Sequence, residues 1–291
     1  MARFDVTHAS HVGPRFASKR ENQDATFASQ SAGKLVFALA DGVSTSVGAG
    51  LAARLAVAEF CRAGLMADST PVGAMASAKR VLNETLDRLT RASDSELFVL
   101  APDLPPSSVR LLLANTSSRF KHWPVALATT LIGCVVDSIE SSENAIAQFV
   151  MVGDGQIEIL GRDGTVRTLI EVDPDQTRID FALCPNRHSS KAMEEQGYSE
   201  LQCRLNPGEV LLTSSDGLLR GRERTISGVL QWAGMHPADW PGENATWAAS
   251  AIDSVLGIVE KGYPNRRDCA DNLSLVAVRM TASEVSNGVQ S

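Results

Sequence analysis

The sequence has 291 residues, of which 44% are hydrophobic and 21% are charged, and its formal net charge is −7. This composition is ordinary for a globular protein and supplies ample apolar material for a core. An acidic chain gains nothing from a phosphate backbone, so nucleic acid is excluded as an expected partner. No stretch reaches the roughly 18 apolar residues of a membrane span. The first residues also lack the apolar run of a signal peptide, so we expect a cytoplasmic protein with no membrane partner.

The cysteines give no sign of a zinc site or of a disulfide framework. They are odd in number and well separated, whereas zinc ligands cluster and secreted frameworks need pairs. We therefore expect reduced thiols, most of them in the core. The five are Cys61, Cys134, Cys184, Cys203 and Cys269.

Short apolar runs bounded by turn residues predict strands, and longer stretches with apolar residues at helical spacing predict helices. Thr70-Pro71 is typical of a helix start, Asn244 is a candidate cap, and Asp163-Gly164 is typical of a hairpin turn. In chain order we expect edge strands within Asp5–Phe27, a strand at Leu35–Ala40, helices at Gly48–Cys61 and Pro71–Arg91, strands at Val125–Val136, Ala145–Val152, Ile157–Leu160, Val166–Ile170 and Glu209–Thr213, a helix at Ala245–Val259 and a last strand at Leu273–Val278.

Two segments are interpreted as peripheral elaborations that shape a substrate groove. Ser95–Trp123 carries three prolines around a short apolar patch, and Arg222–Glu243 carries two tryptophans and two prolines. The last residues, 283–291, are small and polar and are expected to form a flexible tail. Residues 1–282 are then expected to form one domain.

The order of these elements indicates the fold class. It is not the regular strand–helix alternation of a parallel sheet. Strands dominate both ends of the chain, and one pair of helices lies near its beginning. The pattern favours an α+β sandwich with antiparallel strands inside and helices outside.

Four aspartates stand at the tips of predicted strands. Asp41 and Asp154 each follow an apolar run and precede a glycine. Asp216 repeats this pattern, and Asp271 comes just before the last strand. A carboxylate at such a place is costly unless something cancels its charge. Divalent cations such as Mg²⁺ or Mn²⁺ prefer oxygen ligands, so the pattern predicts a cation site.

A simpler interpretation is that each Asp-Gly pair is only a turn. Asp-Gly is a common turn dipeptide, and a single pair indicates a turn more often than a ligand. Asp163-Gly164 is such a turn, because it joins two alternating segments. The set as a whole favours a site, because several of its members follow buried-type strands rather than polar runs.

Six short motifs carry a resemblance to a known family. They are Lys19-Arg20-Glu21-Asn22-Gln23-Asp24-Ala25, Ala40-Asp41-Gly42-Val43, Ala128-Thr129-Thr130-Leu131, Val152-Gly153-Asp154-Gly155, Thr213-Ser214-Ser215-Asp216-Gly217-Leu218 and Asp271-Asn272-Leu273-Ser274. Their order and spacing resemble the metal-dependent protein phosphatases of the protein phosphatase 2C type, in their bacterial form. The resemblance extends from about Phe4 to Met280. It implies a four-layer α-β-β-α sandwich with two central antiparallel sheets flanked by helices, which agrees with the α+β sandwich inferred from the segments.

The resemblance also implies a site for two divalent metal ions, Mn²⁺ or Mg²⁺. Asp41 would bridge both ions, and the carbonyl of Gly42 would bind one of them. Asp216 and Asp271 would complete the ligation of the other ion. With Asp41 they would form the catalytic set.

Four further residues receive roles from the same resemblance. Asp24 would lie beside the metal pair, either as a direct ligand or one layer further out. Asp154 would bind a third, weaker metal. Lys19 and Arg20 stand near the position of the family's phosphate-binding arginine and would contact the substrate phosphate.

The chain departs from the family pattern at four places, none of which removes a predicted bridging or direct aspartate ligand. Gln23 replaces an acidic residue, and Lys19 replaces the arginine. Ser44-Thr45 replaces a pair of glycines, and Ala128 replaces the glycine of a Gly-Ser/Thr-Thr pattern.

The implied function is hydrolysis of phosphoserine and phosphothreonine in proteins by a metal-activated water. A cognate kinase would be a separate protein, because the chain carries no kinase domain. One alternative is a catalytically weak or dead relative that acts as a phosphoprotein-binding regulator. A second is a haloacid-dehalogenase-type enzyme, which would need Asp-x-Asp where this chain has Asp41-Gly42-Val43. A third is a calcium-stabilised structural sandwich, which would gather its oxygen ligands in one loop.

Overall fold

The structure is a computed structural model. It describes residues 3–12, 22–31, 33–44, 46–101, 104–114, 126–138, 144–171, 182–185, 197–218, 225–235, 246–260 and 272–281. Two five-stranded sheets, antiparallel throughout, form its centre. Sheet A has the order β1-β10-β9-β6-β7, with β1 Arg3–His11, β10 Leu273–Thr281, β9 Val210–Ser214, β6 Gln156–Leu160 and β7 Val166–Ile170. Sheet B has the order β2-β3-β4-β5-β8, with β2 Asp24–Ser31, β3 Lys34–Asp41, β4 Leu131–Ser138, β5 Ala145–Val152 and β8 Ser199–Leu205.

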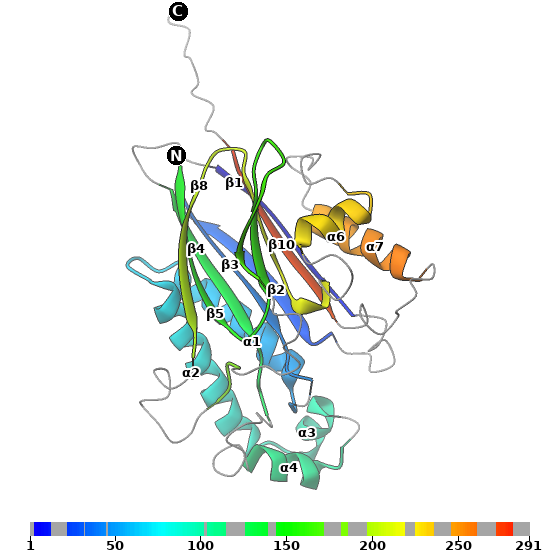
Figure 1. Cartoon of the computed structure of the whole chain (residues 1–291). Coiled ribbons are helices and arrows are strands. Elements are labelled where there is room, and N and C mark those ends of the chain that lie inside the picture. Colours follow the sequence, from blue (N-terminus) through cyan, green and yellow to red (C-terminus); the bar gives the residue numbers. More distant parts are fainter. Residues whose placement is uncertain are drawn as a thin grey trace, which may run out of the picture.

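Helices cover the outer faces of both sheets, which gives the α-β-β-α order of layers (Figure 1). The helices on the side of sheet B are α1 Ala49–Gly64 and α2 Pro71–Leu89, followed by the short pair α3 Asp94–Leu100 and α4 Pro106–Ala114. The helices on the side of sheet A are α6 Ile226–Trp232 and α7 Trp247–Glu260. The predicted four-layer α+β sandwich is therefore confirmed. In the part of the chain that the structure describes, no helix has the length and apolar character needed to cross a bilayer.

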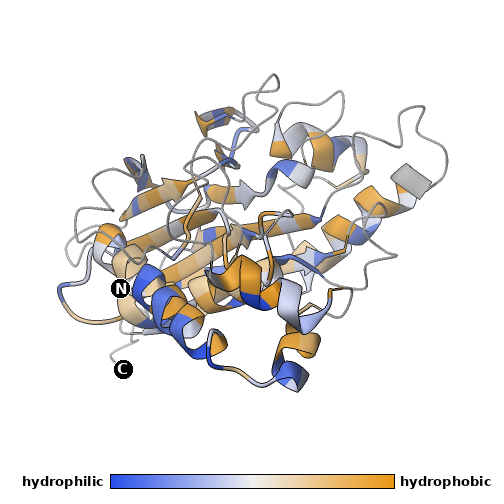
Figure 2. Ribbon diagram, turned by 90° about the horizontal axis from the view of Figure 1, so that it is seen from below, coloured by the Kyte–Doolittle hydropathy of each residue, from blue (hydrophilic) through white to orange (hydrophobic). Residues whose placement is uncertain are grey.

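Three hydrophobic layers hold the sandwich together. One lies between sheet B and the α1–α2 pair, one between the two sheets, and one between sheet A and the α6–α7 pair. The phenyl ring of Phe60 on α1 lies so close to Gly133 of β4 that a Cβ at Gly133 would overlap it. Figure 2 shows mainly hydrophobic strands at the centre and helices that carry both hydrophobic and hydrophilic residues. Each helix thus buries one face and leaves the other to solvent.

Most predicted elements are confirmed within one to three residues. The predicted strand Ala145–Val152 has the bounds of β5, and the Ile157–Leu160 and Val166–Ile170 hairpin is β6 and β7. At the hairpin turn, the Asp163 carboxylate accepts a hydrogen bond from the Thr165 backbone N–H at 3.0 Å. Helix α2 begins as predicted. The hydroxyl oxygen of Thr70 accepts a hydrogen bond from the Gly73 N–H at 3.1 Å, and Pro71 occupies the first helical turn.

The predicted strand Val125–Val136 is correct only in its second half. β4 begins at Leu131, and Ala126 and Thr129 before it form only isolated bridges. The strand is interrupted at Leu127, whose φ of 51° an extended strand does not allow. Its N–H instead donates to the Val47 carbonyl at 2.9 Å, so this stretch follows the loop before α1.

Four elements were not predicted. Strand β8 carries a readable alternation, since Leu201, Cys203 and Leu205 alternate with exposed polar residues, and α3, α4 and α6 lie in the two segments interpreted as elaborations. Helix α3 carries a readable signal, since Ser93 and Glu96 form a reciprocal capping box at its start. Asn244, the candidate cap of the last helix, lies outside the described residues.

A buried carboxylate anchors α6 to sheet A. Glu158 on β6 is 0% exposed. Its two oxygens accept hydrogen bonds from the Ile226 N–H at 2.6 Å, the Ser227 N–H at 3.1 Å and the Ser227 hydroxyl at 3.0 Å. The Gln156 side-chain amide donates to it as well. These donors include backbone groups of the first turn of α6, so one side chain both caps the helix and ties it to the sheet.

Glu158→Gln should lower the free energy of unfolding by about 3 kcal/mol, because the new amide group would face N–H donors that need an acceptor. Urea denaturation followed by circular dichroism measures the change. Glu200→Gln, on the exposed face of β8, is the matched control and should stay within about 0.5 kcal/mol of wild type. An equal, small effect of both substitutions would contradict the anchoring role.

Candidate metal centre

Two of the predicted aspartates face each other across neighbouring strands of sheet B. Asp24 opens β2, Asp41 closes β3, and the strand register pairs them directly. In an antiparallel pair, directly opposite residues share one face and have Cβ atoms about 5 Å apart. The pairing of two strands is therefore enough to bring both carboxylates together at one end of the sandwich.

The turn after Asp41 has room only for glycine. The Gly42 N–H donates to the Gln23 carbonyl oxygen at 3.0 Å. A Cβ at Gly42 would lie 2.8 Å from that oxygen and 2.8 Å from the carbonyl group of Ala49, the first residue of α1. The backbone of this turn is thus packed between β2 and the start of α1, and it fixes where the chain leaves Asp41.

The backbone of Asp41 is also held from the side of β4. Its carbonyl oxygen accepts from the Thr130 N–H at 2.7 Å and from the Thr129 hydroxyl at 2.9 Å. Its own N–H donates to the Thr130 hydroxyl oxygen at 3.0 Å. Three hydrogen bonds from two adjacent threonines leave the main chain of Asp41 little freedom, so its side chain starts from a fixed point.

Sheet A supplies a third carboxylate. β9 ends at Ser214, and the chain turns through Ser215 into the short 3₁₀ helix Asp216–Leu218. Asp216 is only 6% exposed, and its charge acts on Asp24 and raises the pKa of that carboxyl. Carboxylates from both sheets therefore meet at the same end of the molecule.

Burial dominates the electrostatics of Asp24. The side chain is 3% exposed, and loss of water raises its pKa from the usual 3.8 to about 6. Side-chain hydrogen bonds with Asp41, Ser274 and Ser215 lower the pKa, and the charge of Asp216 raises it further. The ionised form of Asp24 is thus unfavourable in this place unless a positive charge offsets it.

The two oxygens of Asp24 have different surroundings. Oδ2 accepts a hydrogen bond from the Ser274 hydroxyl at 2.7 Å. Oδ1 is buried and finds no hydrogen-bond donor among the residues that the structure describes. A buried carboxylate oxygen without a donor is costly, and a divalent cation is the partner that such an oxygen prefers. The residues present therefore fit a divalent cation.

The structure places only some of the other predicted site residues. Asp154 is half-buried in the turn between β5 and β6, between Gly153 and Gly155. These two glycines have φ values of 92° and 145°, which require glycine. A third metal at Asp154 remains a prediction. Three further residues, Lys19, Arg20 and Asp271, lie outside the described residues.

The described residues make up part of a site rather than a complete one. Within them, no group of three or more His, Cys, Asp or Glu side chains is arranged so that it could hold a metal ion alone. The roles of Asp24, Asp41, Gly42 and Asp216 as ligands therefore stay proposals, with Asp271 as the expected additional ligand.

Sequence reasoning assigned no role to the hydroxyl residues around the carboxylates. Thr129 and Thr130 hold the backbone of Asp41, and Ser274 binds the side chain of Asp24. A signal was present, because each of these residues lies in one of the six motifs. Residue type alone does not tell a structural hydroxyl from one that binds a carboxylate.

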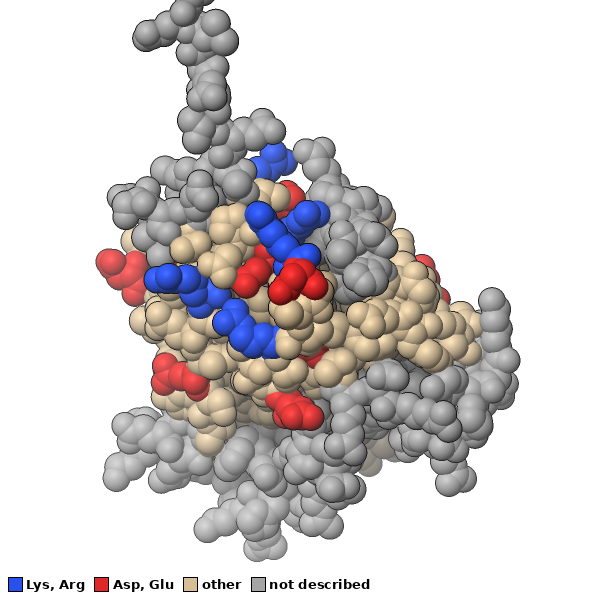
Figure 3. All heavy atoms as spheres, turned by 45° about the horizontal axis from the view of Figure 1, so that its top comes forward, with Lys and Arg blue, Asp and Glu red and all other residues tan. Residues whose placement is uncertain are grey.

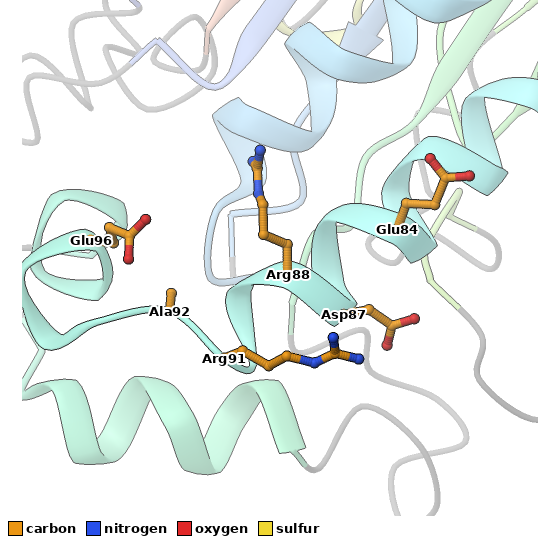
Figure 4. A pocket seen from close by; sticks show the side chains of 6 residues that line it. All are labelled: Glu84, Asp87, Arg88, Arg91, Ala92 and Glu96. Carbon is orange, nitrogen blue, oxygen red and sulfur yellow. The ribbon is translucent and has the colours of Figure 1, made fainter.

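Two other charged regions do not compete with this site. A pocket of about 450 Å³ lies where α2 ends and α3 begins, and it is lined by charges of both signs. Its side chains point in different directions, and none is a predicted site residue (Figure 4). Figure 3 shows the molecule with the top of Figure 1 tilted toward the viewer. On this face, basic and acidic side chains lie next to one another. Among the described ion pairs, Arg3 is 3.8 Å from Asp5, and Lys34 is 3.7 Å from Asp137.

Two antiparallel sheets between helical layers, with carboxylates of both sheets at one end, are the architecture of the metal-dependent protein phosphatases. The chain belongs to this family, because the protein phosphatase 2C profile matches residues 15–234. No curated protein sequence matches the chain.

Solved structures of bacterial proteins share the fold. PppA, described as a key regulatory component of the type VI secretion system (T6SS) in Pseudomonas aeruginosa, has a TM-score of 0.59 and 18% identity, covering 95% of this chain and 97% of its own. The serine/threonine phosphatase of S. agalactiae has a TM-score of 0.59 and 14% identity, covering 95% and 99%. The catalytic domain of the phosphatase PstP, solved in complex with two manganese ions, has a TM-score of 0.55 and 16% identity, covering 97% and 100%. At these identities the likeness shows the fold.

The raised pKa of Asp24 predicts how the metal-free protein responds to pH. Because the folded protein holds this proton more tightly than the unfolded chain, the contribution of Asp24 to stability is fully present below about pH 4. It is lost as the pH rises through about 6. In EDTA at pH 7.5, Asp24→Asn should therefore be more stable than wild type by on the order of 3 kcal/mol, and the difference should vanish near pH 4. Urea unfolding at several pH values measures it.

Asp253→Asn, on the exposed face of α7, serves as the control and should show no such pH-dependent difference. A constant offset between Asp24→Asn and wild type across this pH range would show that burial of the Asp24 charge does not destabilise the metal-free fold.

Proposed function

We propose that this protein is a metal-dependent serine/threonine phosphoprotein phosphatase that hydrolyses phosphate monoesters with a metal-activated water. The observation that carries the proposal is that Asp24 of sheet B lies opposite Asp41 and within the electrostatic influence of Asp216 of sheet A, while its buried Oδ1 has no hydrogen-bond donor among the described residues. Membership of the protein phosphatase 2C family supports it. The two manganese ions in the structure of the PstP catalytic domain support the use of divalent metals.

The proposed ligands are Asp41, the Gly42 carbonyl, Asp216 and Asp271, with Asp24 beside them and Asp154 at a weaker third ion. When bound, two Mn²⁺ or Mg²⁺ ions supply a water of lowered pKa and polarise the phosphoryl oxygens. Apart from Asp271, whose placement is not described, these residues belong to the end of the sandwich where β2 begins and β3 and β9 end.

The other steps fall to the chain itself. Three hydrogen bonds with Thr129 and Thr130 hold the main chain of Asp41. Its carboxylate could therefore bind metal ions without a shift of the strand. Lys19 and Arg20 would bind the phosphate of the substrate and orient it for attack, Arg through two N–H groups and Lys as a point charge. The family pattern has an acidic residue where this chain has Gln23. The surroundings of Asp24 therefore carry one negative charge fewer than that pattern would give.

The proposed substrate is a phosphoprotein carrying phosphoserine or phosphothreonine, supplied by a separate kinase. The proposed catalytic domain spans residues 1–282, with 283–291 as a flexible tail, and the proposed location is the cytoplasm. Aspartates from two sheets support this proposal better than they support a calcium-stabilised loop, in which the ligands come from one short segment.

Hydrolysis of p-nitrophenyl phosphate and of a phosphothreonine peptide tests the proposal. Activity should require Mn²⁺ or Mg²⁺ and disappear in EDTA. Asp216→Asn should lower kcat/KM for both substrates by at least about 100-fold, because it removes a metal-binding charge. Asp253→Asn on α7 is the matched control and should keep wild-type activity.

Each contrary result has a distinct meaning. A wild-type protein that binds Mn²⁺ but hydrolyses neither substrate would favour a phosphoprotein-binding regulator without catalytic activity. Activity that survives both EDTA and Asp216→Asn would contradict the assignment of the site.

A further inference from the structure

The carboxylate of Asp24 has a defined orientation that its own strand does not impose. Asp24 is the first residue of β2, and β2 is an edge strand of sheet B. The last torsion of an aspartate side chain is broad, so backbone position alone leaves the carboxylate free to rotate. Something outside β2 must determine which oxygen faces the other carboxylates.

Ser274 of sheet A supplies that determinant. Its hydroxyl donates to Asp24 Oδ2 at 2.7 Å, and Ser274 is fully buried. A hydroxyl–carboxylate bond of this length is of the strong, charge-assisted kind. With Oδ2 held in this way, Oδ1 is the oxygen that remains for another partner.

A second serine fixes Ser274 in turn. The Ser274 N–H donates to the Ser215 hydroxyl oxygen at 3.1 Å, and the Ser215 N–H donates to the Ser274 carbonyl oxygen at 3.3 Å. Ser215 directly precedes Asp216, and its side chain also hydrogen-bonds to Asp24. The reciprocal pair therefore links the chain entering Asp216 to the strand that carries Ser274.

We propose that Ser274, fixed by Ser215, is a positioning residue that turns the Asp24 carboxylate so that Oδ1 faces the divalent cation or a water bound to it. This inference rests on the proposed metal-dependent hydrolysis. The contact joins β10 of sheet A to β2 of sheet B, so it also links the two sheets beside the proposed ligands.

A purely structural role for Ser274 makes a different prediction. If the hydroxyl only joined the two sheets, its loss would lower thermal stability but leave the metal affinity of the folded protein unchanged. If it positions Asp24, its loss weakens metal binding in protein that is still folded. Metal affinity, measured apart from turnover, separates the two roles.

The test is Mn²⁺ binding to the full-length protein by isothermal titration calorimetry, together with the Mn²⁺ concentration that half-saturates hydrolysis of p-nitrophenyl phosphate. Ser274→Ala should raise the Kd for Mn²⁺ and the half-saturating Mn²⁺ concentration by about 10-fold each. This is the usual scale for loss of a residue that orients a metal ligand. At saturating Mn²⁺, kcat should stay within about threefold of wild type. Ser274→Thr keeps the hydroxyl and should restore the affinity.

Ser214→Ala is the matched control. Ser214 is a buried serine on β9, one residue before Ser215, and its hydroxyl has no hydrogen-bond partner among the described residues. Its removal should change Mn²⁺ affinity by less than about twofold. A loss of affinity in this variant equal to that of Ser274→Ala would overturn the proposal, since any buried serine would then matter.

The remaining outcomes are separable. Wild-type protein that neither binds Mn²⁺ nor hydrolyses the ester would overturn the proposed function, and this inference with it. Wild-type binding and hydrolysis with unchanged affinity in Ser274→Ala would overturn the inference alone. If Ser274→Ala does not fold, Ser274→Cys takes its place, because a thiol is a weaker donor of similar size. Equal Mn²⁺ affinities for the proteins with serine, threonine and cysteine at this position would then contradict the positioning role of Ser274.

Discussion

Carboxylates that are buried together repel one another and lose their hydration, and the rest of this structure depends on how that repulsion is offset. Asp24 comes from sheet B and Asp216 from sheet A, and both are almost fully buried. Among the described strands, no ladder hydrogen bonds join A to B, since each sheet is a separate five-stranded ladder. A cation between the carboxylates would link the two sheets at this end of the sandwich.

The surrounding packing makes such an arrangement tolerable. Hydrophobic layers on both sides of each sheet keep the strand ends in register, so the carboxylates cannot move apart freely to relieve repulsion. The α3–α4 pair is attached to this frame beside the site. A Cβ on Gly48, just before α1, would touch Leu100 at the end of α3, whereas Phe98 and Val99 of the same helix are exposed. This added helical pair therefore contacts the loop that leads from Asp41 into α1.

Local sequence signals specify the central strands and the positions of the aspartates, because both depend on neighbours in the chain. A short apolar run such as Ala145–Val152, bounded by turn residues, favours a buried strand, and an aspartate just after it is then expected at the end of the sheet. Strand β8 is an edge strand in which Leu201, Cys203 and Leu205 alternate with exposed polar residues, so its signal is weaker than that of a continuous apolar run. The break at Leu127 depends on its hydrogen bond to Val47, and the role of Ser274 depends on Asp24, which is 250 residues away. Such long-range partners cannot be read from residue type and spacing.

Strands β1 and β10 pair along their full length, from Arg3 opposite Thr281 to His11 opposite Leu273, although they are the first and the last of the described strands in the sequence. At about 5–20 residues per second, a ribosome separates them by roughly 15 to 55 s. Throughout that interval β1 has no partner in sheet A, and β10, the strand that carries Ser274, does not yet exist. A nascent chain therefore cannot assemble the candidate metal centre before β10 has been synthesised. The order of the strands places the completion of sheet A, and the contact between Asp24 and Ser274, after the synthesis of β10.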